Sequence, residues 1–156
     1  MKLTTTATAA LAAMFVAACS SSTGSTAAHI APEKSAPPAS THRAVTLAFG
    51  LAPGAGACTV TGYPGVDSGA GGPLVHADHL PRGYMGGLPE GVDEPPTMTL
   101  TPSVSADAVV ESLAVDKSGD QCPTYTDLRV TPPDATQTST VATTIEACVL
   151  LVHPVT

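Results

Sequence analysis

The residues after position 43 form short runs in which apolar residues alternate with small or polar ones. Val45, Leu47, Phe49 and Leu51 follow this pattern, which is the period of a strand with one buried face. The 15 Pro and 14 Gly residues of the chain cut the sequence into pieces that are too short for a typical helix. The pattern therefore restricts the chain to an all-β fold.

We expect about 7–9 short strands in all, which is the number found in an immunoglobulin-like antiparallel β-sandwich. A Gly-rich turn after Leu51 makes residues 58–60 a hairpin partner of the first strand. The continuously apolar run 148–152 is expected in the centre of a sheet. The remaining expected strands are 98–100, 106–115, 128–130 and 138–144, and a strand-like piece at 73–77.

The first 18 residues have the features of an export signal. Lys2 precedes an apolar stretch, and the small residues Ala17 and Ala18 stand directly before Cys19. The stretch is too short to span a bilayer, so we predict a lipoprotein signal peptide at 1–18 and a diacylglyceryl lipid of the palmitate type on Cys19. The alternative is an ordinary secretory signal in which Cys19 is incidental.

Residues 19–43 are rich in Ser, Thr, Ala and Pro and show no apolar periodicity. Such a composition buries too little surface to offset its chain entropy, so this segment is predicted to be a disordered tether. Residues 44–156 are enough for one domain with one core. The predicted location is the outer face of the cytoplasmic membrane, in the cell envelope.

The net charge of -7 argues against a nucleic-acid partner, and anionic headgroups would repel such a surface. Membrane attachment is therefore expected through the lipid anchor alone.

Three cysteines follow Cys19. An exported domain meets an oxidising compartment, and Cys122 and Cys148 each stand beside a strand-like run, so we predict a disulfide between them. Cys58 is then left over, either as a buried thiol that acts as a small apolar group or as a reactive or intermolecular thiol.

Residues 69–95 form an unusually long segment that is rich in Gly and Pro. It carries the basic Arg82 and the apolar Tyr84, Met85 and Leu88. If these side chains are exposed, the segment is the best candidate for contact with a partner. If they fold onto an open end of the sandwich, it is a lid over the core.

The stretch from Cys58 to Val66 reads CTVTGYPGV and resembles the Cys-x-Leu-x-Gly-Tyr-Pro-Gly-Val motif of the DUF4232 family. Similar to that family are also Leu100-Thr101-Pro102, the run Leu128-Arg129-Val130, and the two cysteines Cys122 and Cys148. The resemblance implies an exported domain of the kind common in actinobacterial lipoproteins, with no known molecular function. The chain departs from the family in lacking a cysteine ahead of the first strand, which leaves Cys58 without its expected mate.

The chemistry of the CTVTGYPGV motif points to a structural role. Gly62 and Gly65 permit positive φ, Pro64 fixes a turn, and Tyr63 can fill a corner while its hydroxyl finds a backbone partner. We expect a folding signature and no catalytic function for these residues.

The sequence contains two weak candidates for a chemical site. Ser68 lies in a Gly-rich stretch like that of a serine protease, but the chain is too short for that fold and offers no partner residues at suitable places. His76, Asp78 and His79 could ligate a metal, but only His76 and Asp78 share a strand face, so a third ligand such as Glu90 or Asp93 would be needed.

The sequence thus predicts a non-enzymatic, cofactor-free envelope lipoprotein that displays loops to a protein, glycan or lipid partner. The alternative is a metal-binding or hydrolytic envelope protein that uses residues 76–94. A third interpretation is a purely structural or antigenic surface protein without a ligand.

Overall fold

The computed structural model describes residues 26–30, 41–51 and 54–156, and these residues form ten strands and no helix. The strands are β1 (Thr26–Ile30), β2 (His42–Leu51), β3 (Cys58–Thr61), β4 (Gly65–Ser68), β5 (Ala77–His79), β6 (Thr97–Leu100), β7 (Ala106–Leu113), β8 (Thr124–Thr131), β9 (Ser139–Glu146) and β10 (Val149–Val152).

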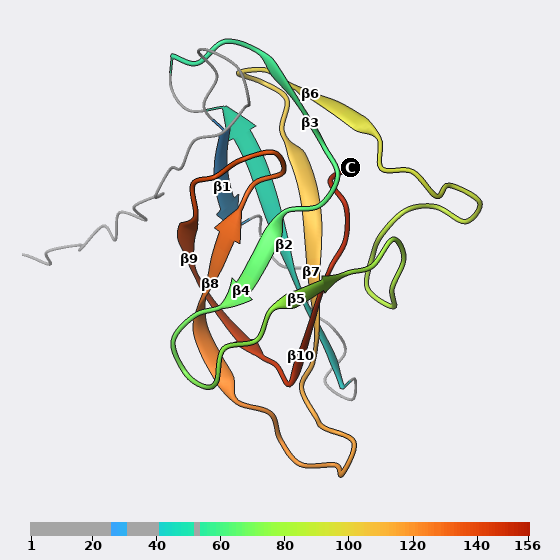
Figure 1. Ribbon diagram of the computed structural model, residues 1–156, viewed down its shortest axis with the longest axis vertical. Helices are drawn as coiled ribbons and strands as arrows, with labels where there is room; N and C mark the ends of the chain where they lie inside the picture. Colours follow the sequence, from blue (N-terminus) through green and yellow to red (C-terminus); the bar gives the residue numbers. More distant parts are fainter. Residues whose placement is uncertain (1–25, 31–40, 52–53) are drawn as a thin grey trace, which may run out of the picture.

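The strands form a sandwich of two sheets with a small ribbon at one end (Figure 1). The larger sheet has the order β1-β2-β7-β10-β5, the smaller sheet has the order β4-β8-β9, and β3 and β6 form the ribbon. All pairs are antiparallel except β10 with β5, which is parallel. The expected all-β sandwich is confirmed, and β10 lies inside its sheet between β7 and β5, as its apolar sequence predicted.

The core lies between the two sheets because every second residue of each long strand points inward. From the larger sheet come residues of β2, β7 and β10, and from the smaller sheet residues of β4, β8 and β9. The core members are Val45, Leu47, Phe49, Val60, Val66, Leu100, Ala106, Ala108, Val110, Tyr125, Leu128, Val130, Val141, Ile145, Ala147, Leu150, Val152 and Val155.

A β-bulge determines which side chains of β8 point into the core. Tyr125 and Leu128 are three positions apart, yet both are fully buried in the core. Strict alternation would send one of them to the surface, but the pairing register between β8 and β9 shifts between Tyr125 and Asp127. The extra residue returns Leu128 to the same face as Tyr125.

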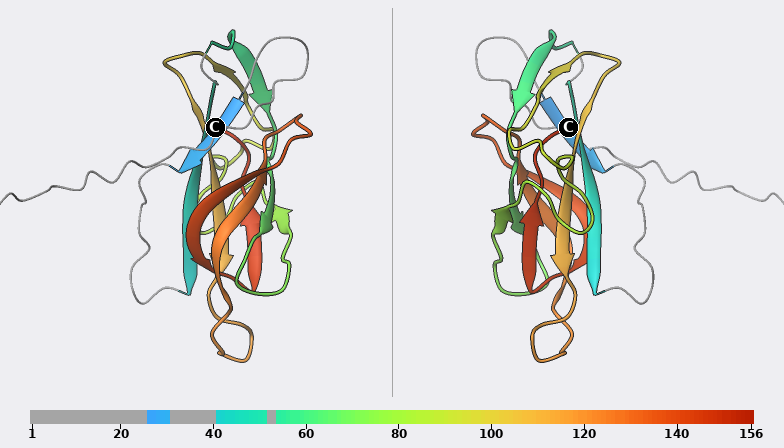
Figure 2. Two further views of the ribbon diagram at one scale, coloured as in Figure 1. Left: turned by 90° about the vertical axis from the view of Figure 1, so that its left-hand side faces the viewer. Right: turned by 90° about the vertical axis from the view of Figure 1, so that its right-hand side faces the viewer.

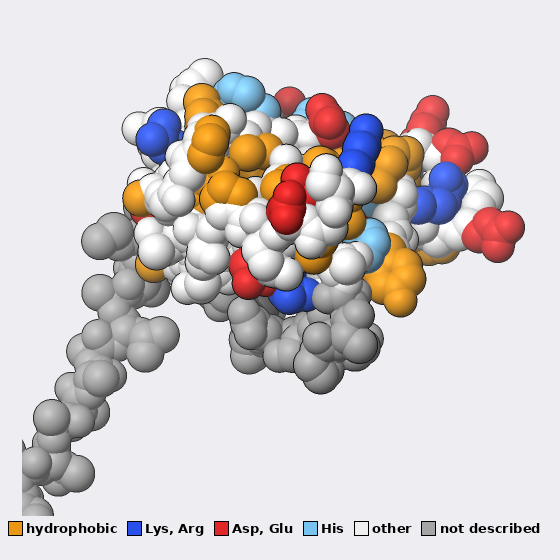
Figure 3. All heavy atoms as spheres, turned by 90° about the horizontal axis from the view of Figure 1, so that it is seen from below, with side chains coloured by type: hydrophobic (Ala, Val, Ile, Leu, Met, Phe, Trp, Pro, Cys, Tyr) orange, Lys and Arg blue, Asp and Glu red, His pale blue; other side chains and the backbone are white. Residues whose placement is uncertain are grey.

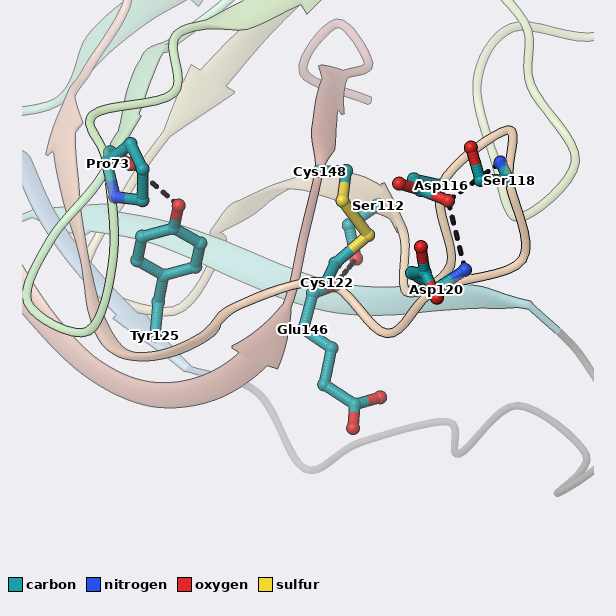
Figure 4. The surroundings of a disulfide bond; sticks show 9 residues. All are labelled: Pro73, Ser112, Asp116, Ser118, Asp120, Cys122, Tyr125, Glu146 and Cys148. Atoms are coloured by element: carbon teal, nitrogen blue, oxygen red, sulfur yellow. Dashed lines mark hydrogen bonds between the residues drawn. A yellow bond between two sulfur atoms is a disulfide. The ribbon is translucent and has the colours of Figure 1, made fainter.

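Several buried contacts hold the lower end of the sandwich together (Figure 4). The Tyr125 hydroxyl donates to the carbonyl of Pro73 at 2.6 Å, and the Ser112 hydroxyl donates to the carbonyl of Glu146 at 2.7 Å. Cys122 and Cys148, the pair expected from the sequence, form a disulfide beside these bonds. The turn between β7 and β8 is stabilised by Asp116, whose carboxylate accepts the N–H groups of Ser118 and Asp120.

The predicted tether is wrong in part. Residues 26–30 form β1, which pairs antiparallel with the second half of β2, and β2 itself begins at His42 instead of residue 44. The physical reason is that without β1 the strand β2 would stand at the edge of its sheet, with a row of unpaired backbone N–H and C=O groups. The rest of the proposed tether, the signal peptide and Cys19 lie outside the described residues.

The predicted hairpin between the first strand and residues 58–60 is also wrong. β3 pairs with β6, because β1 and β7 already occupy the two edges of β2. The segment Gly65–Ser68 was not among the expected strands, but it is strand β4, paired with β8.

Candidate interaction site

The outer face of the larger sheet carries an unexpected polar group. Along β7, Ala106, Ala108 and Val110 point into the core, so Val109 and Glu111 lie on the opposite face. An outward carboxylate on a strand is normally exposed, yet Glu111 is only 1% exposed. Another part of the chain must therefore cover this face.

The cover is a small hairpin, residues 81–88, which we call the docked hairpin. Gly83 N–H donates to the carbonyl of Gly86 at 2.8 Å, and Leu88 N–H donates to the carbonyl of Pro81 at 2.7 Å. These bonds leave Tyr84 and Met85 as a two-residue tip. The chain leaves β5 and passes over β7 and β10 in this hairpin, which forms a third layer on the sheet (Figure 2).

Glycines allow the docked hairpin to lie this close to the sheet. A Cβ atom at Gly83 would stand 2.4 Å from Oε2 of Glu111 and 2.6 Å from Cε1 of His153. Gly87 has a φ of +109°, which favours glycine, and a Cβ there would stand 2.4 Å from the carbonyl oxygen of Pro81. Any side chain at either position would lift the hairpin or break its turn.

Glu111 is the group to which the tip docks. Its Oε2 accepts the backbone N–H of Met85 at 3.1 Å and Nε2–H of His153 at 3.2 Å. Its Oε1 accepts Nδ1–H of His42 at 2.6 Å. These three donors come from the hairpin, from the residue after β10 and from the first residue of β2. One carboxylate thus joins three segments that are far apart in sequence.

The environment lowers the pKa of Glu111 below its ordinary value of 4.5. Burial acts in the opposite direction and is the largest single influence, because it disfavours the charged form. The hydrogen bonds from Met85, His42 and His153, together with the attraction of His42, outweigh it. The carboxylate is therefore ionised when the hairpin is docked.

The buried His153 ring has an acceptor on each side. Nδ1 faces the carbonyl of Leu80 at 2.9 Å, and Nε2 faces the Glu111 carboxylate. Each ring nitrogen of His153 therefore has a hydrogen-bond partner inside the fold.

The tip presents Tyr84 to solvent. Its ring packs against His42, with the ring centroids 4.7 Å apart, yet the residue is 72% exposed. It is the most exposed of the large hydrophobic residues described. Seen from below, charged side chains of both signs gather at one edge of the molecule beside hydrophobic ones (Figure 3). An aromatic ring that is held in place and open to water is a common feature of binding surfaces.

Arg82 fixes the acidic segment that follows the hairpin. Its guanidinium donates to the carbonyls of Pro89, at 3.1 Å, and Val92, and to the carboxylate of Asp93 at 2.7 Å. The predicted partner residue Arg82 therefore has an internal structural task. Glu90, Asp93 and Glu94 remain exposed beside it.

The sequence offered two interpretations of residues 69–95, and each describes part of the segment. Leu88 is buried and Met85 is half-buried, as in a lid, while Tyr84 is exposed, as in a partner surface. The lid lies on the outer face of a sheet and not over an open end of the sandwich. The first part of the segment, residues 69–75, is held at the other end by Tyr125 and Ser68.

The family motif has a structural role. Gly62 has a φ of +95°, and its carbonyl accepts the N–H of Val155, which ties the C-terminal segment to the motif. Pro64 is buried, and Tyr63 stacks its ring on His79 at a centroid distance of 4.5 Å. Gly65 could adopt a positive φ, but it is the first residue of β4 and is not among the glycines with a positive φ.

Ser68 is fully buried and its hydroxyl is used in the fold. It donates to the carbonyl of Pro73 at 3.3 Å and accepts the N–H of Val75 at 2.8 Å. These bonds support the structural interpretation of Ser68 and leave it inaccessible to a substrate.

The residues of the alternative metal site are spread apart. His76 donates through Nδ1 to Asp67 at 2.5 Å, and His79 stacks on Tyr63. Asp78 is exposed on β5. Within residues 26–30, 41–51 and 54–156, no group of three His, Cys, Asp or Glu side chains is placed to hold a metal ion.

The expectation of a leftover thiol at Cys58 is wrong. Cys58 is disulfide-bonded, and no cysteine of the described part of the chain is free. Cys58 is bonded to neither Cys122 nor Cys148, because these two bond each other. The prediction counted only the three cysteines after Cys19, and one of these is left over once Cys122 and Cys148 pair.

The three residues at the centre of the site were not predicted from the sequence. His42 was assigned to the tether, and Glu111 and His153 received no role. A signal was present: Glu111 is the only charged residue between Val109 and Val115, and His153 directly follows the apolar strand β10. Ionisable residues inside apolar strands need buried partners.

Comparison with known proteins gives a family and no function. No curated protein and no solved structure matches the chain. None of the described segments is a helix that could cross a membrane. A model of the family described as "Domain of unknown function (DUF4232)" matches residues 19–156. That match covers most of the chain, including both sheets and the docked hairpin, and the chain therefore belongs to the DUF4232 family.

Proposed function

We propose that this protein is a non-enzymatic lipoprotein of the cell envelope, whose β-sandwich displays the docked hairpin to a protein, glycan or lipid partner. The observation that carries the proposal is the contrast within the hairpin tip. The Met85 backbone is bonded to a buried carboxylate, while the neighbouring Tyr84 is 72% exposed. A tyrosine that is ordered before binding loses little conformational entropy when a partner covers it.

The titratable side chains of the site favour binding over catalysis. Glu111 and His153 are each 1% exposed and are saturated by hydrogen bonds to each other and to the backbone. A general base must reach the proton that it abstracts, and these two groups lie beneath the hairpin. The alternative of a metal-binding or hydrolytic protein that uses residues 76–94 has less support, because His76 and His79 are engaged with Asp67 and Tyr63.

The anchor part of the proposal rests on the sequence of residues 1–19. Lipidation of Cys19 requires that its sulfur is not used in any other bond. A cysteine sulfur that carries a lipid thioether cannot also form a disulfide, and the chain has four cysteines, two of which are Cys122 and Cys148. A lipid on Cys19 and an intrachain bond from Cys58 to Cys19 therefore exclude each other, and the proposal requires that Cys58 of the lipidated protein bonds a cysteine of a second molecule.

Site-specific photo-crosslinking in intact cells tests the display function. A photoreactive phenylalanine derivative replaces Tyr84 in one variant and the exposed Leu74 in a matched variant, since Leu74 is 55% exposed and lies outside the hairpin. We expect a discrete crosslinked species from position 84 that is absent from position 74. No crosslinked species at position 84, or the same species at both positions, would contradict the proposal.

A further inference from the structure

The interaction of Glu111 with the docked hairpin has a consequence for how the loop responds to acid. The hairpin has no large apolar side chain buried at its tip, since Tyr84 is exposed and Met85 is half-buried. Its tip is held to the sheet by the hydrogen bond from Met85 N–H to Oε2 of Glu111. The state of one carboxylate therefore controls how firmly the tip is attached.

We propose that Glu111 is an acid-releasable latch: its carboxylate clamps the docked hairpin onto the sheet, and its protonation frees the hairpin. The geometry supports this because the three hydrogen-bond partners of the carboxylate are all donors, namely Met85 N–H, His42 Nδ1–H and His153 Nε2–H. A proton added to the carboxyl group would face another donor, so the group could no longer satisfy all three.

Charge acts in the same direction. The titratable side chains that face Glu111 are His42 from β2 and His153 after β10, with Tyr84 of the hairpin stacked over His42. Arg82 is directed to Pro89, Val92 and Asp93 instead. When Glu111 takes up a proton in acid, the negative charge between the two imidazole rings is lost, and with it the attraction between Glu111 and His42.

The lowered pKa of Glu111 supports this order of events, because the latch stays closed until the pH falls below the ordinary range of a glutamate. The latch is a property of the fold and does not depend on the identity of any partner. The latch bears on the proposed function in one respect, because release of the hairpin would change how Tyr84 is displayed.

Amide hydrogen exchange of the full-length protein across pH 3 to 7 tests the latch, with each rate corrected for intrinsic exchange. We expect the protection of the Met85 and Leu88 amides against exchange to fall by about tenfold or more as Glu111 is protonated. A fall of this size corresponds to the loss of roughly one charge-assisted hydrogen bond. The amides of β8, such as Val130, serve as the internal reference and should keep their protection. Unchanged protection of Met85 down to pH 3 would overturn the proposal.

A variant separates Glu111 from the other carboxylates. Glu111→Gln imitates the protonated group and should leave Met85 weakly protected at every pH, while β8 remains protected. Glu146→Gln is the matched control, because Glu146 pairs with Arg43 on the surface, 2.9 Å away. If Glu111→Gln keeps wild-type protection at Met85, the latch is refuted. If that variant does not fold, the pH series of the wild-type protein decides alone.

Discussion

Oε1 of Glu111 lies 2.6 Å from Nδ1 of His42, although 69 positions separate the two residues. This bond links the first residue of β2 to the middle of the sheet and places an imidazole beneath the ring of Tyr84. The exposed tyrosine of the hairpin is thus supported by a buried carboxylate, and both belong to one connected set of contacts.

Gly83→Ala should loosen the docked hairpin. The added methyl group would stand 2.4 Å from Oε2 of Glu111, well inside van der Waals contact, so the tip must move away. We expect a loss of about 1–3 kcal/mol in the free energy of unfolding, measured by urea titration. Gly56→Ala is the matched control, since a Cβ there meets nothing within 4 Å, and it should stay within about 0.5 kcal/mol of wild type. Equal stability of the two variants would show that the hairpin does not dock at Gly83.

Tyr125→Phe should destabilise the sandwich without changing its shape. The hydroxyl of the fully buried Tyr125 donates to the Pro73 carbonyl at 2.6 Å, and its removal leaves that carbonyl without this donor. The expected cost is about 1–2 kcal/mol. Tyr84→Phe is the control, because Tyr84 is exposed, and it should change stability by less than about 0.5 kcal/mol. Chemical denaturation of both variants under one condition measures the difference.

Removal of the Cys122–Cys148 bond should cost about 3.5 kcal/mol on the chain-entropy account, since the cysteines are 26 positions apart. The double substitution of both cysteines by Ala gives this value in urea titrations. Wild-type protein in a reducing buffer should lose at least as much, because the bond of Cys58 is reduced as well. A double variant as stable as wild type would mean that the unfolded chain is already held compact near these residues.

The stability of the protein should fall in acid by an amount that depends on Glu111. Its pKa is lower in the folded state than the ordinary 4.5, so the unfolded chain binds the proton more tightly. The contribution is complete above the unfolded value and is lost as the pH falls through the lower folded value. Urea titrations at several pH values between 7 and 3 should show this loss for wild type and a smaller one for Glu111→Gln. Parallel pH profiles for the two proteins would contradict the role of Glu111.

The strands that alternate most regularly were predictable from the sequence, and the pairings between distant segments were not. β2, β7 and β10 follow directly from their apolar patterns. The bulge at Tyr125 and Asp127 changes the phase of β8, which no regular period reveals. β1 was missed because its composition is that of a tether, and only its pairing with β2 makes it a strand.

The candidate site was predictable in one part. The sequence singled out Tyr84, Met85 and Leu88, and the structure divides them into an exposed tip and a buried base. The residues that hold the hairpin in place could not be predicted, because the contact of Glu111 with His42 and His153 depends on the register of three strands in one sheet. Two strands of correct sequence but shifted register would separate these residues.

The proposal as a whole depends most on the fate of the sulfur of Cys19. Protein isolated from the membranes of its native cell can be digested without reduction and analysed by mass spectrometry. Our account predicts an N-terminal peptide that begins at Cys19 and carries a diacylglyceryl thioether. A peptide in which Cys19 is linked to Cys58 by a disulfide, or an uncut leader with an unmodified Cys19, would contradict it.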